Sequence, residues 1–241
     1  MSTVKNNSTI LSRGSRVGVF LQVRLDSSRL PGKALLTLGG KSVVRLAMEA
    51  LRAVPAEVYA LLTDAESSQG LTEYAAAAGF EVYTGPKDDV LKRYARAIEY
   101  YQVETVIRAT GDNPLVSGEC AARLLELYRS RSVDYSGFYG LPVGTGVECV
   151  RAEALLRADR SAAGAYEREH VCPYLYNNPQ QFVIYRPSAP PECFAPELRV
   201  TLDTERDYRR LLTIFDSLYT GEPISTERLI RGVAQLHLIA G

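Results

Sequence analysis

The sequence predicts a three-layer α/β/α fold in which helices cover both faces of a mostly parallel central sheet. Short, β-branched apolar runs alternate with longer amphipathic stretches from residue 17 to residue 128, as in sheets with helical crossovers. The length of 241 residues allows one large domain, or one domain with a small appendage. Hydrophobic residues make up 46% of the chain, which is enough for a sizeable core.

Four strand–helix units are expected in the first half of the chain. The first strand, residues 17–23, is short, rich in valine and nearly free of charge, as expected for a strand buried on both faces. Further strands are predicted at residues 58–62, 81–83 and 105–109. The helices that follow the four strands are expected to begin at the capping residues Ser42, Ser67 or Ser68, Asp88 and Ser117.

The alternation ends near Asp134. Residues 135–146 hold five glycines or prolines and two tyrosines, which predicts a long loop over the face that carries the candidate site. The remaining elements are predicted as a strand at 147–150, helices at 152–158 and 165–176, a strand at 182–185, a Pro-rich linker at 187–196, a strand at 198–202, and helices at 205–219 and 226–239.

Composition argues against several classes of protein. Equal numbers of basic and acidic residues, 28 of each, give no broad attraction for nucleic acids or anionic membranes. The four cysteines lack C-x-x-C spacing and only two histidines are present, which argues against a structural zinc site. Residues 1–16 are polar and lack the apolar core of a signal peptide. We therefore expect a flexible tail before a domain at 17–241, in a cytoplasmic protein with reduced thiols.

Three cations follow the first strand closely. Arg24, Arg29 and Lys33 flank a Pro-Gly turn, with Asp26 as the one acid among them, where open α/β sheets bind their ligands. Arginine presents a planar fork of donors to phosphate, and lysine a compact charge. We interpret the loop as a phosphate site. The competing interpretation is a solvated loop with scattered charges.

Two acids follow apolar runs that are predicted to be strands. Asp112 and Asp203 should reach the same edge of the sheet if those strands are parallel. Two carboxylates there can share Mg2+, which prefers oxygen ligands. Taken alone, Asp112 is equally explained as a turn residue, and Asp203 is better explained as a helix cap.

Residues 24–35, R-L-D-S-S-R-L-P-G-K-A-L, resemble the nucleotide-binding loop of the cytidylyltransferase family, which includes CMP-Kdo synthetase, acylneuraminate cytidylyltransferase and SpsF-like spore-coat polysaccharide proteins. Val23 replaces the alanine that usually precedes this loop. The segments T-G-D-N-P-L-V at 110–116, T-L-D-T-E-R-D-Y at 201–208 and Y-E-R-E-H-V at 166–171 resemble further motifs, the last of them SpsF-like. The resemblance implies a nucleotide-diphospho-sugar transferase, Rossmann-like fold.

The resemblance also implies an activity. The chain would be a nucleotidyltransferase that uses CTP and Mg2+ to activate a sugar, sugar acid or related phosphate for surface polysaccharide biosynthesis, releasing pyrophosphate. Arg24, Arg29 and Lys33 would be catalytic, and Asp112 and Asp203 would hold the metal. The nucleotide-binding candidates are Arg24, Ser28, Arg29, Gly32, Lys33, Thr63, Asp64 and Arg108, and the acceptor candidates are Glu148, Arg168, Glu169 and His170.

Other interpretations stay open at this point. The SpsF-like pattern G-x-D-V-E has Gly146 in place of its acid, so the chain could be a catalytically impaired nucleotide-binding module of the same fold. The helix with Arg168, Glu169 and His170 could be a solvated charged face. Aromatic residues at 135, 138 and 139 suit either a homodimer interface or a lid over the acceptor. Because Lys33 lies in a polar loop, Lys33→Ala is expected to weaken CTP binding and leave the fold intact.

Overall fold

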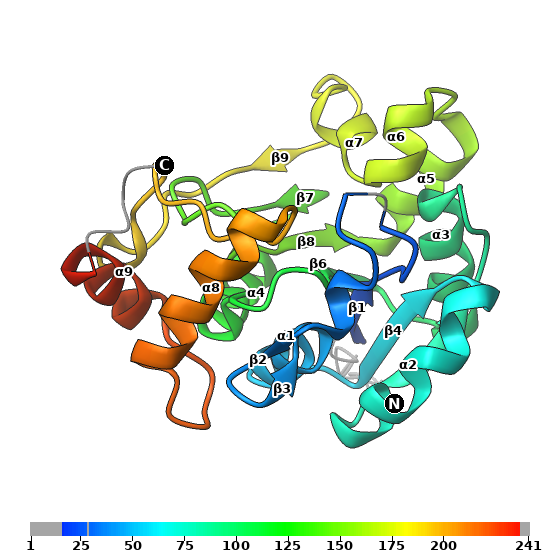
Figure 1. The fold of residues 1–241 in the computed structure, drawn as a ribbon. Helices are drawn as coiled ribbons and strands as arrows, with labels where there is room; N and C mark the ends of the chain where they lie inside the picture. Colours follow the sequence, from blue (N-terminus) through cyan, green and yellow to red (C-terminus); the bar gives the residue numbers. More distant parts are fainter. Residues whose placement is uncertain (1–15, 28, 237–241) are drawn as a thin grey trace, which may run out of the picture.

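The central sheet contains seven strands in the computed structural model, which describes residues 16–27 and 29–236 (Figure 1). Pairing is parallel along β5-β4-β1-β6, antiparallel for β6-β8 and β8-β7, and parallel for β7-β9. The predicted mostly parallel sheet is therefore confirmed. The strands are β1 (Val17–Gln22), β4 (Val58–Thr63), β5 (Glu81–Thr84), β6 (Thr105–Thr110), β7 (Tyr135–Ser136), β8 (Glu148–Arg151) and β9 (Ile184–Tyr185).

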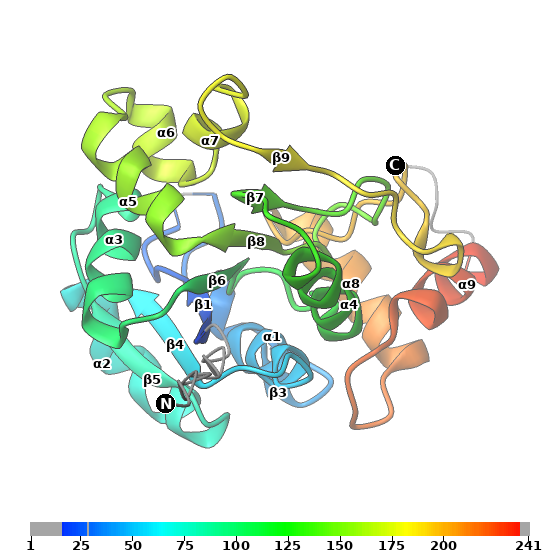
Figure 2. The ribbon, with the colours of Figure 1, turned by 180° about the vertical axis from the view of Figure 1, so that it is seen from behind.

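Helices cover both faces of the sheet, as Figures 1 and 2 show from opposite sides. Alternation along β1 assigns its side chains to two cores, since Val19 and Leu21 belong to one and Phe20 to the other. The three-layer arrangement follows from this division. The first core contains α1 (Val43–Leu51), α2 (Ala65–Ala77) and α4 (Gly118–Arg129), and the second contains α3 (Val90–Tyr101), α5 (Ala152–Ser161) and α7 (Pro173–Tyr176).

A third hydrophobic core lies beside α1. It joins the hairpin of β2 (Thr37–Leu38) and β3 (Lys41–Ser42) to α8 (Glu205–Leu218) and α9 (Thr226–Gln235). Leu38, Leu202 and Phe215 are almost completely buried in it. Full burial of such a side chain contributes about 1.5–3 kcal/mol. This core holds residues 198–203 near the carboxyl end of the sheet. None of the helices in the described ranges is long and apolar enough to cross a membrane.

One predicted strand is absent from the sheet. Residues 198–202 are extended but form only an isolated bridge between Val143 and Arg199. The Val143 N–H donates to the Leu198 carbonyl, and the Val200 N–H donates to the Val143 carbonyl, both at 2.8 Å. The alternating apolar side chains face the third core, which gives a strand-like pattern without a place in the sheet.

Several predicted boundaries also change. Asp64 caps α2 in place of Ser67 or Ser68, and Asp89 caps α3 in place of Asp88, whereas Ser117 caps α4 as predicted. The expected loop at 135–146 begins with β7. The helix expected at 165–176 is interrupted at Val171, where φ is 73°, and forms α6 (Ala165–His170) and α7. The predicted tail lies outside the described residues up to residue 15, as do residues 237–239 of the last predicted helix.

Candidate functional site

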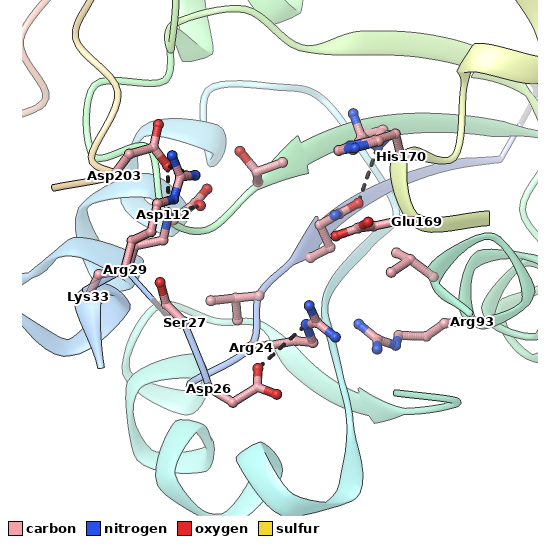
Figure 3. Close-up of a pocket in the computed structure, with 15 residues that line it drawn as sticks. Arg24, Asp26, Ser27, Arg29, Lys33, Arg93, Asp112, Glu169, His170 and Asp203 are labelled. Carbon is pink, nitrogen blue, oxygen red and sulfur yellow. Dashed lines mark hydrogen bonds and ion pairs between the residues drawn. The ribbon is translucent and has the colours of Figure 1, made fainter. Parts of the chain in front are cut away.

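A cavity of about 400 Å3 lies beyond the carboxyl ends of β1 and β6 (Figure 3). This is the edge where open α/β sheets bind ligands. Its walls come from the loop after β1, the end of β6, the start of α3, the end of α6 and the segment before α8. The residues that line it are Gln22, Val23, Arg24, Asp26, Ser27, Arg29, Lys33, Val90, Arg93, Arg108, Thr110, Asp112, Glu169, His170 and Asp203.

Lys33 holds the two predicted metal-binding acids together. Its Nζ lies 2.6 Å from Asp112 Oδ2 and 3.2 Å from Asp203 Oδ1, and it donates to the Leu202 carbonyl at 2.9 Å. Gly32 before it has φ of 66°, a left-handed conformation that glycine adopts without strain. Lys33 begins the 3-10 helix η1 (Lys33–Leu35) and is only 8% exposed. The structure therefore brings Asp112 and Asp203 together although the strand predicted before Asp203 is absent.

Asp203 is surrounded by cations. Besides Lys33, Arg29 approaches Oδ1 and Arg199 approaches Oδ2, each at 3.1 Å. Burial raises the pKa of Asp203, but Lys33, Arg29 and Arg199 lower it more, so the net change is downward. The alternative role of Asp203 as a helix cap is wrong, because Thr204 caps α8 in a capping box with Asp207.

A second group of arginines shapes the wall near α3. Arg24 contacts Asp26, Asp88 and the Lys87 carbonyl. Arg93 is 1% exposed and donates to the carbonyls of Pro86 and Lys87 at 2.6–3.0 Å. Sequence analysis missed Arg93, because an arginine in a helix is usually interpreted as solvent-facing. The signal that could have revealed it is its place on the same side of α3 as the apolar residues.

Arg108 and Glu148 are cross-strand neighbours on β6 and β8. Arg108 Nη1 lies 2.5 Å from Glu148 Oε2, and its Nε donates to Gln22 Oε1 at 3.2 Å. The Tyr135 hydroxyl donates to Glu148 Oε1 at 2.9 Å. Burial alone would lower the pKa of Arg108, but the Glu148 carboxylate raises it by more than burial lowers it. The net change in pKa is upward, so the guanidinium stays charged.

Arg108 and Thr110 also line a second cavity, of about 470 Å3. Its other walls come from Ala109, Asn113, Tyr135, residues 137–144 and 146–148, Arg186 and Thr201. Arg186 lies over the rings of Tyr135 and Tyr176, with 5.5 and 4.8 Å from its guanidinium carbon to the ring centroids. The two cavities therefore adjoin at the end of β6.

Some predicted site residues lie elsewhere. Thr63 is 0% exposed and Asp64 2%, and the Asp64 carboxylate accepts from the backbone N–H and hydroxyl of Ser67, so neither lines the cavity. This corrects their expected position beside the base. Gly32 shapes the turn before Lys33 without lining the cavity. Ser28 lies outside the described residues.

The predicted acceptor candidates are divided between different places. Glu169 and His170 line the first cavity, and Glu148 lines the second. Arg168 lines neither cavity, which corrects its expected contact with the acceptor. Its guanidinium instead pairs with Asp89 and Asp159.

Within residues 16–27 and 29–236, a group of side chains that could ligate a metal lies away from these cavities. The donor atoms of Glu119, Cys120 and Cys193 lie within 4.8 Å of one another, although the two cysteines are far apart in sequence. The spacing of the cysteines in the sequence therefore did not predict this group, because folding brings Cys193 close to Cys120. Burial and the neighbouring Cys120 raise the pKa of Cys193 to about 12, so this thiol is protonated near neutral pH.

Comparison with known proteins gives the family. The family model described as Cytidylyltransferase matches residues 19–238. The chain belongs to the cytidylyltransferase family. Its members are nucleotidyltransferases, which confirms the predicted enzyme class.

Relatives match the cytidylyltransferase chain over most of its length. An uncharacterised protein of Methanocaldococcus jannaschii is 32% identical over 197 residues, covering 80% of this chain and 81% of its own. The spore coat polysaccharide biosynthesis protein SpsF of Bacillus subtilis is 29% identical over 217 residues, covering 87% of this chain and 90% of its own. The structure of a cytidylyltransferase from Leptospira borgpetersenii has 25% identity and a TM-score of 0.86, and the match covers 93% of this chain and 96% of that one. A CMP-Kdo synthetase complexed with CTP, at 15% identity and a TM-score of 0.65, shares the fold and covers 84% and 99%.

Proposed function

We propose that this cytidylyltransferase joins the CMP moiety of CTP to a sugar, sugar acid or related phosphate and releases pyrophosphate. The observation that carries the proposal is the convergence of Lys33, Asp112 and Asp203, from three distant segments, at one end of the first cavity (Figure 3). That end combines cations for phosphate oxygens with carboxylates for a metal.

The cations of the first cavity suit a triphosphate. Arg29 and Lys33 lie at the end with Asp203, and Arg24 lies between that end and α3 (Figure 3). Phosphoryl-type transfer depends mainly on in-line positioning and on stabilising charge that develops on the phosphate oxygens. In this proposal the three side chains orient the phosphates and neutralise that charge.

The carboxylates at the same end fit a divalent cation. Asp112 Oδ2 and Asp203 Oδ1 face one nitrogen atom, so these two oxygens are close to a common point, and carboxylate oxygens are preferred by Mg2+. Asp112 and Asp203 would hold the ion, which when bound would neutralise phosphate charge as a Lewis acid. A structural neighbour with 16% identity is a complex with manganese, so the choice of metal is part of the proposal.

The second cavity would bind the acceptor. Because it meets the first cavity at Arg108 and Thr110, an acceptor oxygen could approach the α-phosphate there from the side opposite the leaving pyrophosphate. Arg108 is held by Glu148 and Gln22, which orients its charge at this junction. Glu148 would therefore act on the acceptor side partly through Arg108.

The relatives support the polysaccharide setting. SpsF is described as a spore coat polysaccharide biosynthesis protein, and a 3-deoxy-manno-octulosonate cytidylyltransferase of Neisseria meningitidis is 35% identical over 121 residues. That match covers 48% of this chain and 46% of the relative, so the acceptor in the relative's name is not extended to this chain. We extend the polysaccharide role and a cytoplasmic location to this chain as proposals.

A nucleotide panel tests the function. The full chain is incubated with Mg2+ and CTP, UTP, ATP or GTP against a mixture of sugar phosphates and sugar acids, and pyrophosphate release is measured. We expect release with CTP that depends on the acceptor mixture. CTP binding without release under any acceptor condition would instead support the impaired binding module. The absence of binding to any of the nucleotides would refute both.

The loop after β7 suits a homodimer, which we retain as a proposal. Tyr139 is 63% exposed, and its ring packs against that of Phe194, itself 42% exposed, with 5.9 Å between centroids. Such exposed aromatic pairs are enriched at interfaces. Light scattering that gives a monomer at micromolar concentration would remove this proposal.

A further inference from the structure

Helix α6 supplies two residues to the first cavity but has little packing of its own. Glu169 and His170 line the cavity, yet no residue of α6 is buried. The next residue, Val171, is fully buried and has φ of 73°, a conformation that costs free energy for a β-branched side chain. A surface helix that ends in a strained residue needs another attachment to keep its position.

Arg168 provides that attachment. Its Nε and Nη2 donate to the two carboxylate oxygens of Asp89 at 2.9 and 2.5 Å, and Nη2 also donates to Asp159 Oδ1 at 2.7 Å. Its Nη1 donates to the backbone carbonyls of Asp159 and Ala162 at 2.7 and 3.4 Å. The guanidinium therefore joins α6 to both α3 and the end of α5. Bidentate pairing of this kind fixes orientation as well as distance.

The residues that pair with Arg168 are also connected to the helix that lines the cavity. Asp89 caps α3 by accepting from the Lys92 N–H at 2.9 Å, and Val90 and Arg93 of the same helix line the cavity. Asp159 is only 7% exposed and pairs with Lys92 as well. One guanidinium thus fixes two walls, residues 90–93 and residues 169–170, relative to each other.

These walls lie at the opposite end of the cavity from the residues that are proposed to bind the phosphates. Figure 3 shows Glu169, His170 and Arg93 on one side, and Lys33, Asp112 and Asp203 on the other. A nucleotide whose phosphates contact Lys33 therefore places its nucleoside toward α3 and α6. We propose that Arg168 is a positioning residue that fixes the nucleoside end of the cavity by holding α6 against the start of α3. This inference rests on the proposed function, since it requires a nucleotide in the cavity.

The test compares a ligand that has a nucleoside with one that lacks it. Affinities for CTP and for inorganic tripolyphosphate, both with Mg2+, are measured by calorimetry on the full chain and on Arg168→Met and Arg168→Lys. We expect Arg168→Met to weaken CTP binding on the order of 10- to 100-fold, since small misplacement of a positioned ligand has effects of that size. Tripolyphosphate affinity should be unchanged. Arg168→Lys should recover part of the loss, because it keeps the charge without the bidentate fork.

Two further variants separate positioning from general damage. Arg157→Met removes an arginine of α5 that donates to the Gln181 carbonyl and lies over Phe182, and it should bind both ligands normally. If Arg168→Met alone does not fold, adding Asp159→Asn removes one buried carboxylate that the first change deprives of its arginine partner, although Lys92 still pairs with it.

The outcomes are distinct. Normal CTP binding by folded Arg168 variants, or an equal loss for both ligands, would overturn the positioning role. Failure of the wild type to bind either ligand would instead refute the proposed function.

Discussion

Removing the Lys33 ammonium should weaken both the fold and the binding of CTP. The sequence placed Lys33 in a polar loop and predicted an intact fold for Lys33→Ala. The structure argues against that expectation, because the side chain is 8% exposed and contacts Asp112, Asp203 and the Leu202 carbonyl. Without the ammonium, two carboxylates face each other with less compensating charge.

The size of the effect follows from these contacts. A hydrogen bond to a charged group contributes about 1.5–3 kcal/mol. Removing one partner of a buried ion pair costs about 3–5 kcal/mol, but the side chains of Asp112 and Asp203 are 33% and 20% exposed and solvent screens them. We therefore expect a loss of about 2–4 kcal/mol in unfolding free energy. At about 2–4 °C per kcal/mol for a chain of this size, the Tm should fall by about 4–16 °C.

The assay measures Tm by scanning calorimetry, with and without Mg2+, and CTP affinity by titration. Mg2+ should raise the Tm of Lys33→Ala more than that of the wild type, because an ion bound by both carboxylates replaces the missing charge. CTP affinity should fall about 10- to 100-fold, as the loss of one charge-assisted contact predicts. An unchanged Tm would refute the structural role of Lys33, and unchanged CTP affinity would refute its contact with phosphate.

Three further outcomes are expected. Asp112→Asn and Asp203→Asn should each abolish Mg2+-dependent turnover, and the double variant should cost little more than either; losses that multiply would show that the two acids do not hold one ion. Gly146→Asp should fold normally, because the nearest atom to an added Cβ is 3.7 Å away. It should change the KM for the acceptor more than the KM for CTP, and equal changes in the two KM values, or none, would exclude a contact between the acceptor and residue 146. The pKa of Asp203 is lowered from 3.8 on folding, so its contribution to stability is present above that value and is lost as the pH falls through the lower folded pKa. The Tm of the wild type should therefore fall more steeply than that of Asp203→Asn as the pH is lowered below 3.8, and parallel curves would contradict this.

The fold was predictable wherever the apolar pattern of the sequence agrees with the burial of the same residues in the folded chain. The apolar run at 17–23 becomes β1 because both of its faces are covered, and the strands at 58–62 and 105–109 follow the same rule. Helix starts were less certain where several polar residues adjoin, as at Asp64 and Ser67, since each can cap a helix. Residues 198–202 have the alternation of a strand, but sequence alone does not reveal whether a partner strand is available.

The site was predictable where its chemistry is concentrated in one loop. Arg24, Arg29 and Lys33 were found from their spacing around a Pro-Gly turn, and all three line the cavity. Arg93 was missed because its role depends on backbone carbonyls that only the folded loop presents. Arg168 was assigned to the acceptor because a charged motif does not show which way its side chains point.

The position of Asp203 would couple ligand binding to the stability of α8 and α9. Its neighbours Leu198, Val200 and Leu202 pack with α8 and α9, while Lys33 connects it to Asp112 at the end of β6. A ligand held by these three residues would therefore fasten the third core to the sheet. Local opening of α8 would have to break that connection first, so its amide protons should exchange with solvent more slowly when the cavity is filled. Hydrogen exchange in a helix that lines neither cavity would then report nucleotide binding.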